Sequence, residues 1–149
     1  MIPERVGTSW QEGWVPMIVR SLDQIRGTDR DVETEKWASR RLLVRGDGLG
    51  FSLSETIIHP GSESTIWYKN HFEACYCVEG EGEIESLAPD RWKSKIEPGT
   101  LYALNQHDRH ILRAFTTLKL ICVFNPALAG TEVHDSDGSY PLPADCGET

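Results

Sequence analysis

Glu73, Tyr102 and a histidine from the segment 106–110 are the residues whose side chains could together hold a metal ion. A carboxylate, a phenolate and an imidazole form a hard, oxygen-rich donor set, which suits iron better than zinc and leaves positions open for substrate. A phenol, whose ordinary pKa is about 10, loses its proton when a nearby cation drives the ionisation. Spacing alone leaves two hypotheses open: a metal site built from these residues, or a site that has lost its metal and binds a ligand or nothing.

The spacing around Glu73 resembles the first metal motif of the cupins, G-x5-H-x-H-x3-E-x6-G. Its fixed positions are filled, in order, by Gly61, Trp67, Lys69, Glu73 and Gly80. In the second cupin motif, Pro98-Gly99 is followed by Tyr102 where a third histidine is usual. The glycine and proline positions of the two motifs are present, but Glu73 is the only residue at a ligand position that is of the standard type.

The elements that must position these residues are short strands separated by Gly and Pro turns. We expect strands within 37–44, 50–58, 65–87 (broken at 79–82), 93–96, 100–104, 110–114 and 118–124. This spacing predicts an all-β fold, the cupin double-stranded β-helix or jelly-roll barrel, with short helical turns. A further strand is predicted to start at Met17, Ser21 to Gln24 matches a capped helical turn, and 28–36 is predicted to be a loop. We expect residues 1–16 to be an N-terminal extension and 17–149 a single cupin domain with an irregular C-terminal tail.

Alternation along the strands predicts which side chains share a face. If Glu73 points inward, His71, Cys75 and Cys77 point inward with it. For the two thiols, buried packing is the favoured reading over metal ligation, because zinc sites usually carry a second cysteine pair or a histidine motif. Strict alternation would turn Tyr68 away from the interior unless a bulge or bend near residue 70 intervenes.

Composition narrows the class of protein. The chain of 149 residues carries a net charge of −8 with no basic cluster, which argues against nucleic acid and anionic membranes as partners. No run approaches the roughly 20 apolar residues of a membrane helix, and residues 1–16 lack the apolar stretch of a secretion signal. We therefore expect a cytoplasmic protein.

The stretch 66–85, IWYKNHFEACYCVEGEGEIE, resembles the central motif of the ectoine synthases. Further motifs support the resemblance in the same order: 102–110 (YALNQHDRH), 122–126 (CVFNP) and 130–140 (GTEVHDSDGSY). With Met17-Ile-Val-Arg20 and the Trp37/Arg41 pair, it runs from Met17 to about Pro143. The resemblance implies cyclising dehydration of N-γ-acetyl-L-2,4-diaminobutyrate to the compatible solute ectoine, by an Fe(II)-dependent homodimeric hydro-lyase.

The resemblance also implies roles for individual residues. The iron ligands would be Glu73, Tyr102 and His110. The substrate contacts would be Trp37, Arg41, Ser54, Thr56, Tyr68, His71, Cys122, Phe124, Glu132 and His134, although a larger polar residue is expected at Ser54. Tyr68, Thr56, Glu132 and His134 are the candidates for moving protons.

These residue types suit the reaction, because an amide carbonyl needs a Lewis acid and a flexible substrate needs to be held folded. Arg41 would clamp the substrate carboxylate, and Trp37 and Phe124 would exclude water. Each also has a simpler interpretation: the aromatic residues as core, Arg41 as a solvated neighbour of Arg40, and the tail residues as exposed loop. A non-catalytic cupin that binds a small amino-acid derivative is the alternative function, and an iron oxygenase is a third.

Overall fold

The computed structural model describes residues 17–142. Short β-strands account for almost all of the regular secondary structure in these residues. The predicted N-terminal extension (residues 1–16) and the last residues of the predicted tail (143–149) lie outside the described residues. The elements are α1 (Leu22–Ile25), β1 (Asp31–Glu33), β2 (Trp37–Leu43), a 3-10 turn (Arg45–Asp47), β3 (Ser52–Ile58), β4 (Glu63–Ile66), β5 (Phe72–Glu79), β6 (Gly82–Ser86), β7 (Trp92–Ile96), β8 (Leu101–Leu104), β9 (His110–Ala114) and β10 (Leu118–Asn125).

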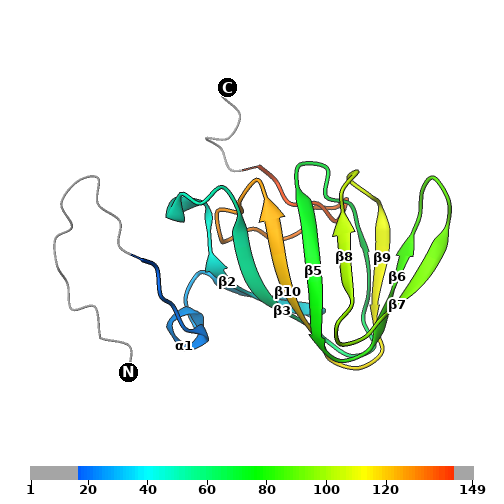
Figure 1. Ribbon diagram of the computed structural model, residues 1–149, viewed down its shortest axis with the longest axis horizontal. Coiled ribbons are helices and arrows are strands. Elements are labelled where there is room, and N and C mark those ends of the chain that lie inside the picture. Colours follow the sequence, from blue (N-terminus) through cyan, green and yellow to red (C-terminus); the bar gives the residue numbers. More distant parts are fainter. Residues whose placement is uncertain (1–16, 143–149) are drawn as a thin grey trace.

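The strands form two antiparallel sheets that face each other, as the jelly-roll prediction requires (Figure 1). The larger has six strands in the order β1-β2-β3-β10-β5-β8, and the smaller has four in the order β4-β9-β6-β7. The last strand in the sequence, β10, lies in the middle of the larger sheet, where it pairs with both β3 and β5. No helix in residues 17–142 is long and apolar enough to cross a membrane.

Two of the expected elements are wrong. The segment from Met17 to Ser21 is not a strand but leads directly into α1, where the Gln24 side chain accepts a hydrogen bond from the Ser21 backbone N–H. Residues 28–36 are not all loop, because β1 adds to the edge of the larger sheet by pairing Asp31 with Arg40. Strand β1 has no apolar alternation, and pairing with β2 is what makes it extended.

The alternation predicted for the two central strands is confirmed. His71, Glu73, Cys75 and Cys77 are all buried, while Tyr76 between them is half-exposed. On β10, Leu118, Leu120, Cys122 and Phe124 point inward and are buried. Each fully buried leucine contributes roughly 1.5–3 kcal/mol relative to an exposed one. The core therefore lies between the sheets, and the candidate residues are part of it.

The strand register places polar side chains from distant segments in a single row across the inner face of the larger sheet. We call this the central row; through successive ladder pairs it consists of Arg41, Ser54, Cys122, Cys75 and Tyr102. The next row on one side contains Phe124 opposite Glu73, and the next on the other side contains Thr56 opposite Leu120. Opposed residues in a ladder share a face, so the register gathers the predicted site.

Candidate active site

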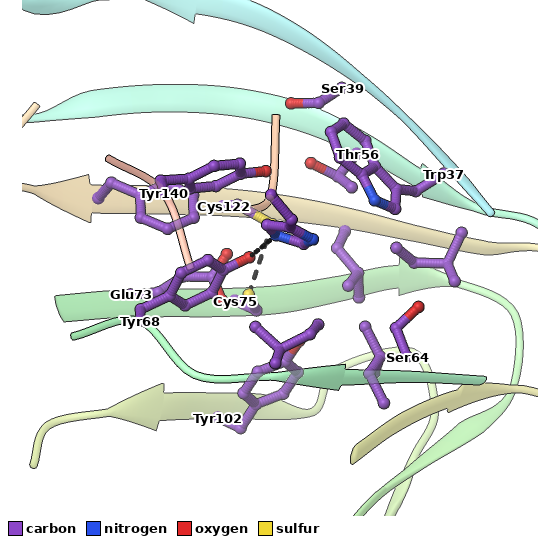
Figure 2. Close-up of a pocket in the computed structure, with 16 residues that line it drawn as sticks. Trp37, Ser39, Thr56, Ser64, Tyr68, Glu73, Cys75, Tyr102, Cys122 and Tyr140 are labelled. Carbon is purple, nitrogen blue, oxygen red and sulfur yellow. Dashed lines mark hydrogen bonds between the residues drawn. The ribbon is translucent and has the colours of Figure 1, made fainter. Parts of the chain in front are cut away.

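A partly open pocket lies between the two sheets (Figure 2). Aromatic and aliphatic side chains make up most of its lining, with a few polar groups among them, as is usual for small-molecule sites. The predicted site residues that line it are Trp37, Thr56, Tyr68, Glu73, Tyr102, Cys122, Phe124 and His134. The other predicted residues (Arg41, Ser54, His71, His110 and Glu132) are buried but are not part of its lining.

Glu73 reaches the pocket from β5 as a buried carboxyl group, and no basic side chain of residues 17–142 forms an ion pair with it. Burial raises the pKa of Glu73 to about 7, and hydrogen bonds from the thiols of Cys75 and Cys122 partly oppose that shift. A carboxyl group left among apolar and thiol groups is costly to ionise unless a cation compensates. A cation bound beside Glu73 would therefore stabilise the ionised form of its carboxyl group.

His110 begins β9 in the opposite sheet and is 1% exposed. Its Nδ1 lies 2.9 Å from the carbonyl oxygen of Asp108, which can only accept, so Nδ1 carries the proton. Burial lowers the pKa of His110, which keeps the ring neutral and leaves a free lone pair on Nε2. That atom is buried and has no hydrogen-bond partner among the described residues. A histidine held in this way through its other nitrogen is the usual state of a metal ligand.

Tyr102 enters the pocket from β8, opposite Cys75 in the ladder. Burial raises the pKa of its phenol, and the neighbouring Cys75 and Glu73 raise it further. The phenol is therefore neutral without a cation and needs one to become a ligand. The donor chemistry of Glu73, Tyr102 and His110 fits an iron ion, and their role as ligands stays a prediction.

Tyr68 and His134 form the one direct side-chain hydrogen bond between two predicted proton carriers in the described residues. The Tyr68 hydroxyl lies 2.8 Å from Nε2 of His134. Burial lowers the pKa of His134 to about 4, and the nearby Arg41 contributes. The imidazole is neutral at ordinary pH, and in the tautomer whose proton lies on Nδ1 its Nε2 accepts the hydrogen bond from Tyr68. Strand β4 ends at Ile66 and a bend precedes β5, which turns Tyr68 inward without a bulge.

Arg41 is completely buried in the central row. Its Nε donates to the Ser39 hydroxyl at 3.1 Å, and its Nη2 donates to the Glu132 carbonyl oxygen at 2.8 Å. Its Nη1 has no partner among the described residues. A buried cation with one unused donor has the chemistry to bind a substrate anion, which excludes the interpretation of Arg41 as a solvated residue.

The Glu132 carboxylate is occupied by its own loop. It accepts hydrogen bonds from the backbone N–H groups of Ala129, Gly130 and Thr131 at 2.8–3.0 Å. This geometry holds the loop that presents the Glu132 carbonyl to Arg41. It favours a positioning role for Glu132 over a proton-moving one.

His71 and the hydroxyl pair complete the predicted set. Both ring nitrogens of His71 are buried without partners among the described residues, and its ring meets Phe124 edge-on at 5.9 Å. Ser54 and Thr56 lie on the same face of β3, with hydroxyls 3.3 Å apart. Thr56 lines the pocket, whereas Ser54, two residues earlier on the same face of β3, does not.

Among the lining residues that were not predicted to have roles, Tyr140 and Cys75 make contacts with the predicted set. Tyr140 stacks on Tyr68 at 5.1 Å between ring centroids and lies 4.5 Å from the His134 ring (Figure 2). The Arg41 guanidinium lies 5.6 Å from the centroid of the Tyr140 ring. In the sequence, Tyr140 appeared only as the last residue of the motif 130–140, without a role assigned to it. Cys75, interpreted as packing, lies 3.4 Å from Cys122 between their sulfur atoms and lines the same pocket.

Comparisons with known proteins show the family to which the chain belongs. The family model described as ectoine synthase matches residues 17–144. The chain is 60% identical to the L-ectoine synthase of Desulfatibacillum aliphaticivorans over 85% of this chain and 98% of that protein. It is 55% identical to the L-ectoine synthase of Oceanobacillus iheyensis over 87% of this chain and 100% of that protein.

Solved structures give the same assignment. The ectoine synthase from P. lautus superposes with a TM-score of 0.75 at 50% identity, over 89% of this chain and 96% of that one. A cupin 2 conserved barrel protein from Salinispora arenicola has a TM-score of 0.58 at 19% identity, over 74% of this chain and 89% of that one. The second likeness shows the cupin fold alone. The chain belongs to the ectoine synthase family of enzymes.

Proposed function

We propose that this enzyme closes N-γ-acetyl-L-2,4-diaminobutyrate into ectoine, with Fe(II) held by Glu73, Tyr102 and His110. The free α-amine attacks the acetamide carbonyl carbon, a C–N bond forms, and the carbonyl oxygen leaves as water with two protons taken from nitrogen. The observation that carries the proposal is the pocket that Glu73, Tyr102 and the Tyr68–His134 pair line together.

The bound ion would act as a Lewis acid that polarises an oxygen in the pocket. Two observations support this assignment. His110 presents an unprotonated Nε2, and Glu73 has no ion pair with a basic side chain in the described part of the chain. Tyr102 would complete the set from the neighbouring strand β8.

The remaining residues bind the substrate and move its protons. The unused Nη1 of Arg41 would bind the carboxylate, which fixes the end of the substrate that carries the amine. Neutral His134 would accept, through the Tyr68 hydroxyl, a proton that the amine releases on attack. Phe124 meets Tyr68 edge-on at 5.1 Å and, with Trp37, walls the pocket against water.

The alternative of a non-catalytic binding cupin has no observation in its favour beyond the missing histidines, and the rebuilt donor set accounts for them. Trp67 and Lys69, which stand at the two histidine positions of the cupin motif, contact each other instead. The Lys69 ammonium lies 4.6 Å from the centroid of the Trp67 ring and forms an ion pair with Asp137. We further propose that the enzyme is a cytoplasmic homodimer, as the family resemblance implies.

The test is the reaction itself. Purified protein is loaded with Fe(II) under anaerobic conditions, supplied with the acetylated diamino acid and assayed for ectoine by chromatography. We expect product that disappears when a chelator removes the ion. Folded, iron-loaded protein that yields no product would overturn the proposed reaction, and full activity in the metal-stripped protein would overturn the role of the ion.

A further inference from the structure

A second set of possible metal donors lies beside the predicted iron ligands. Glu73, Cys75 and Cys122 offer a carboxylate oxygen and two sulfurs that all lie within 4.8 Å of one another. It is the one such group of His, Cys, Asp and Glu donors that residues 17–142 contain. All three side chains are buried.

The sheet itself fixes the arrangement of these donors. Cys75 and Cys122 are directly opposed in the β5–β10 ladder, and Glu73 precedes Cys75 by two residues on the same face. The two sulfurs are 3.4 Å apart. In a tetrahedral site with metal–sulfur bonds of about 2.3 Å, the sulfurs would be about 3.8 Å apart. A movement of a few tenths of an ångström would therefore allow both to bind one ion.

We propose that Glu73, Cys75 and Cys122 form a binding site for a thiophilic divalent cation, of which Zn²⁺ is the typical example. Two thiolates and one carboxylate make a softer donor set than carboxylate, phenolate and imidazole, and soft donors favour zinc-type ions. Binding releases the two thiol protons. All three residues line the pocket, so an ion has a path to them and keeps a coordination position open.

The two donor sets share Glu73, so one carboxylate would serve two kinds of ion. A thiophilic ion held by Glu73, Cys75 and Cys122 would compete with Fe(II) and inhibit the enzyme. That consequence rests on the proposed function, whereas the thiolate site itself does not.

Cobalt titration tests the site directly, because a cobalt–thiolate bond gives an intense charge-transfer absorption that oxygen and nitrogen ligands do not give. The reduced full-length chain would carry Cys146→Ser, since Cys146 lies outside the described residues. We expect one equivalent of Co²⁺ to produce the band and Zn²⁺ to remove it. The Cys75→Ser and Cys122→Ser variants should lose the band and weaken Zn²⁺ binding at least about 100-fold, the upper end of what loss of a supporting group costs.

Cys77→Ser is the matched control. Cys77 is buried two residues further along β5, where its sulfur lies 3.4 Å from the Glu79 carbonyl oxygen and takes no part in the cluster. This variant should keep the band. A His110→Ala variant should also keep it, which separates this site from the predicted iron set.

The outcomes decide the proposal without any activity measurement. A folded, reduced protein that gives no thiolate band refutes the site, and a band that survives Cys75→Ser or disappears in Cys77→Ser refutes the ligand assignment. Zn²⁺ inhibition of product formation is measured separately. If the band follows Cys75 but the iron-loaded protein makes no ectoine, the proposed function fails and the thiophilic site stands.

Discussion

The hydroxyl of Tyr68 and Nε2 of His134, which are 66 residues apart in the sequence, form a hydrogen bond of 2.8 Å. It joins the bend after β4 to the loop that follows β10, and Tyr140 from the same loop stacks on the Tyr68 ring. The active site is therefore completed by a segment without regular structure that is held against the barrel.

Removing the hydroxyl tests this relationship. In Tyr68→Phe, the ring and its stacking remain but the route for a proton to His134 is lost. We expect kcat to fall by about 100-fold or more while KM changes only a few-fold, because general acid–base groups typically contribute that much. The control is Tyr76→Phe, since Tyr76 is half-exposed on the outer face of β5. Equal kcat for wild type and Tyr68→Phe would remove Tyr68 from proton transfer.

Stability should reveal the buried carboxyl group of Glu73. Its folded pKa of about 7 lies above the unfolded value of about 4.5. The stability that the protonated group contributes is therefore fully present below pH 4.5 and is lost as the pH rises through 7. The metal-free protein should lose on the order of 3 kcal/mol over this range through Glu73.

The Glu73→Gln variant isolates that contribution, because it keeps a neutral side chain of similar size. Urea denaturation of the metal-free proteins at several pH values should show the variant gaining stability relative to wild type as pH rises. His134 acts with the opposite sign, since its stability contribution is present above 6.5 and lost as pH falls through about 4, but it is common to both proteins. A difference that stays constant with pH would contradict the raised pKa of Glu73.

Arg41→Lys tests the carboxylate clamp. Lysine keeps the charge but cannot donate to Ser39, Glu132 and a substrate at once. We expect KM to rise roughly 10- to 100-fold, as loss of a charge-assisted hydrogen bond would give. The penalty should disappear with an analogue that lacks the carboxylate. Arg40→Lys on the outer face, which pairs with Asp31 and Glu55, is the matched control.

We expect the aromatic ring of Tyr140, rather than its hydroxyl, to contribute to activity. Tyr140→Phe retains stacking on Tyr68 and the position over which the Arg41 guanidinium lies, so most activity should remain. Tyr140→Leu removes both contacts, and we expect a fall in kcat/KM of roughly tenfold, since aromatic contacts are worth about 0.5–1.5 kcal/mol. If phenylalanine and leucine at this position are equally harmful, the hydroxyl rather than the ring carries the role.

Gly138 fixes the tail against β4. Its φ is +72°, its carbonyl oxygen accepts from the Trp67 backbone N–H, and an added Cβ would come 2.3 Å from the Thr65 carbonyl oxygen. Gly138→Ala should lower stability by more than about 1 kcal/mol and loosen the loop that carries His134 and Tyr140. Gly61→Ala is the control, because its φ is +77° with nothing within 4 Å. Thermal unfolding should show the larger loss at Gly138, and equal losses would mean that strain alone matters.

The sequence by itself determined the strands, their inward faces and the chemistry of the donors. Alternation placed Glu73, Cys75 and Cys77 on one face because side chains in a strand repeat every two residues, and that is a local property. The Gly and Pro turns set the strand lengths for the same reason. The family motifs indicated which residues belong together but not how they meet.

The tertiary structure decided everything that depends on register and on non-local contacts. Ladder pairing set Cys75 opposite both Cys122 and Tyr102, and no periodicity within one segment encodes that choice. The pairing of β1 overrode its loop-like sequence, and the Glu132 carboxylate was committed to backbone N–H groups of its own loop. Tyr140 entered the site because an irregular tail packs back over the barrel, where contacts between distant residues outweigh local preference.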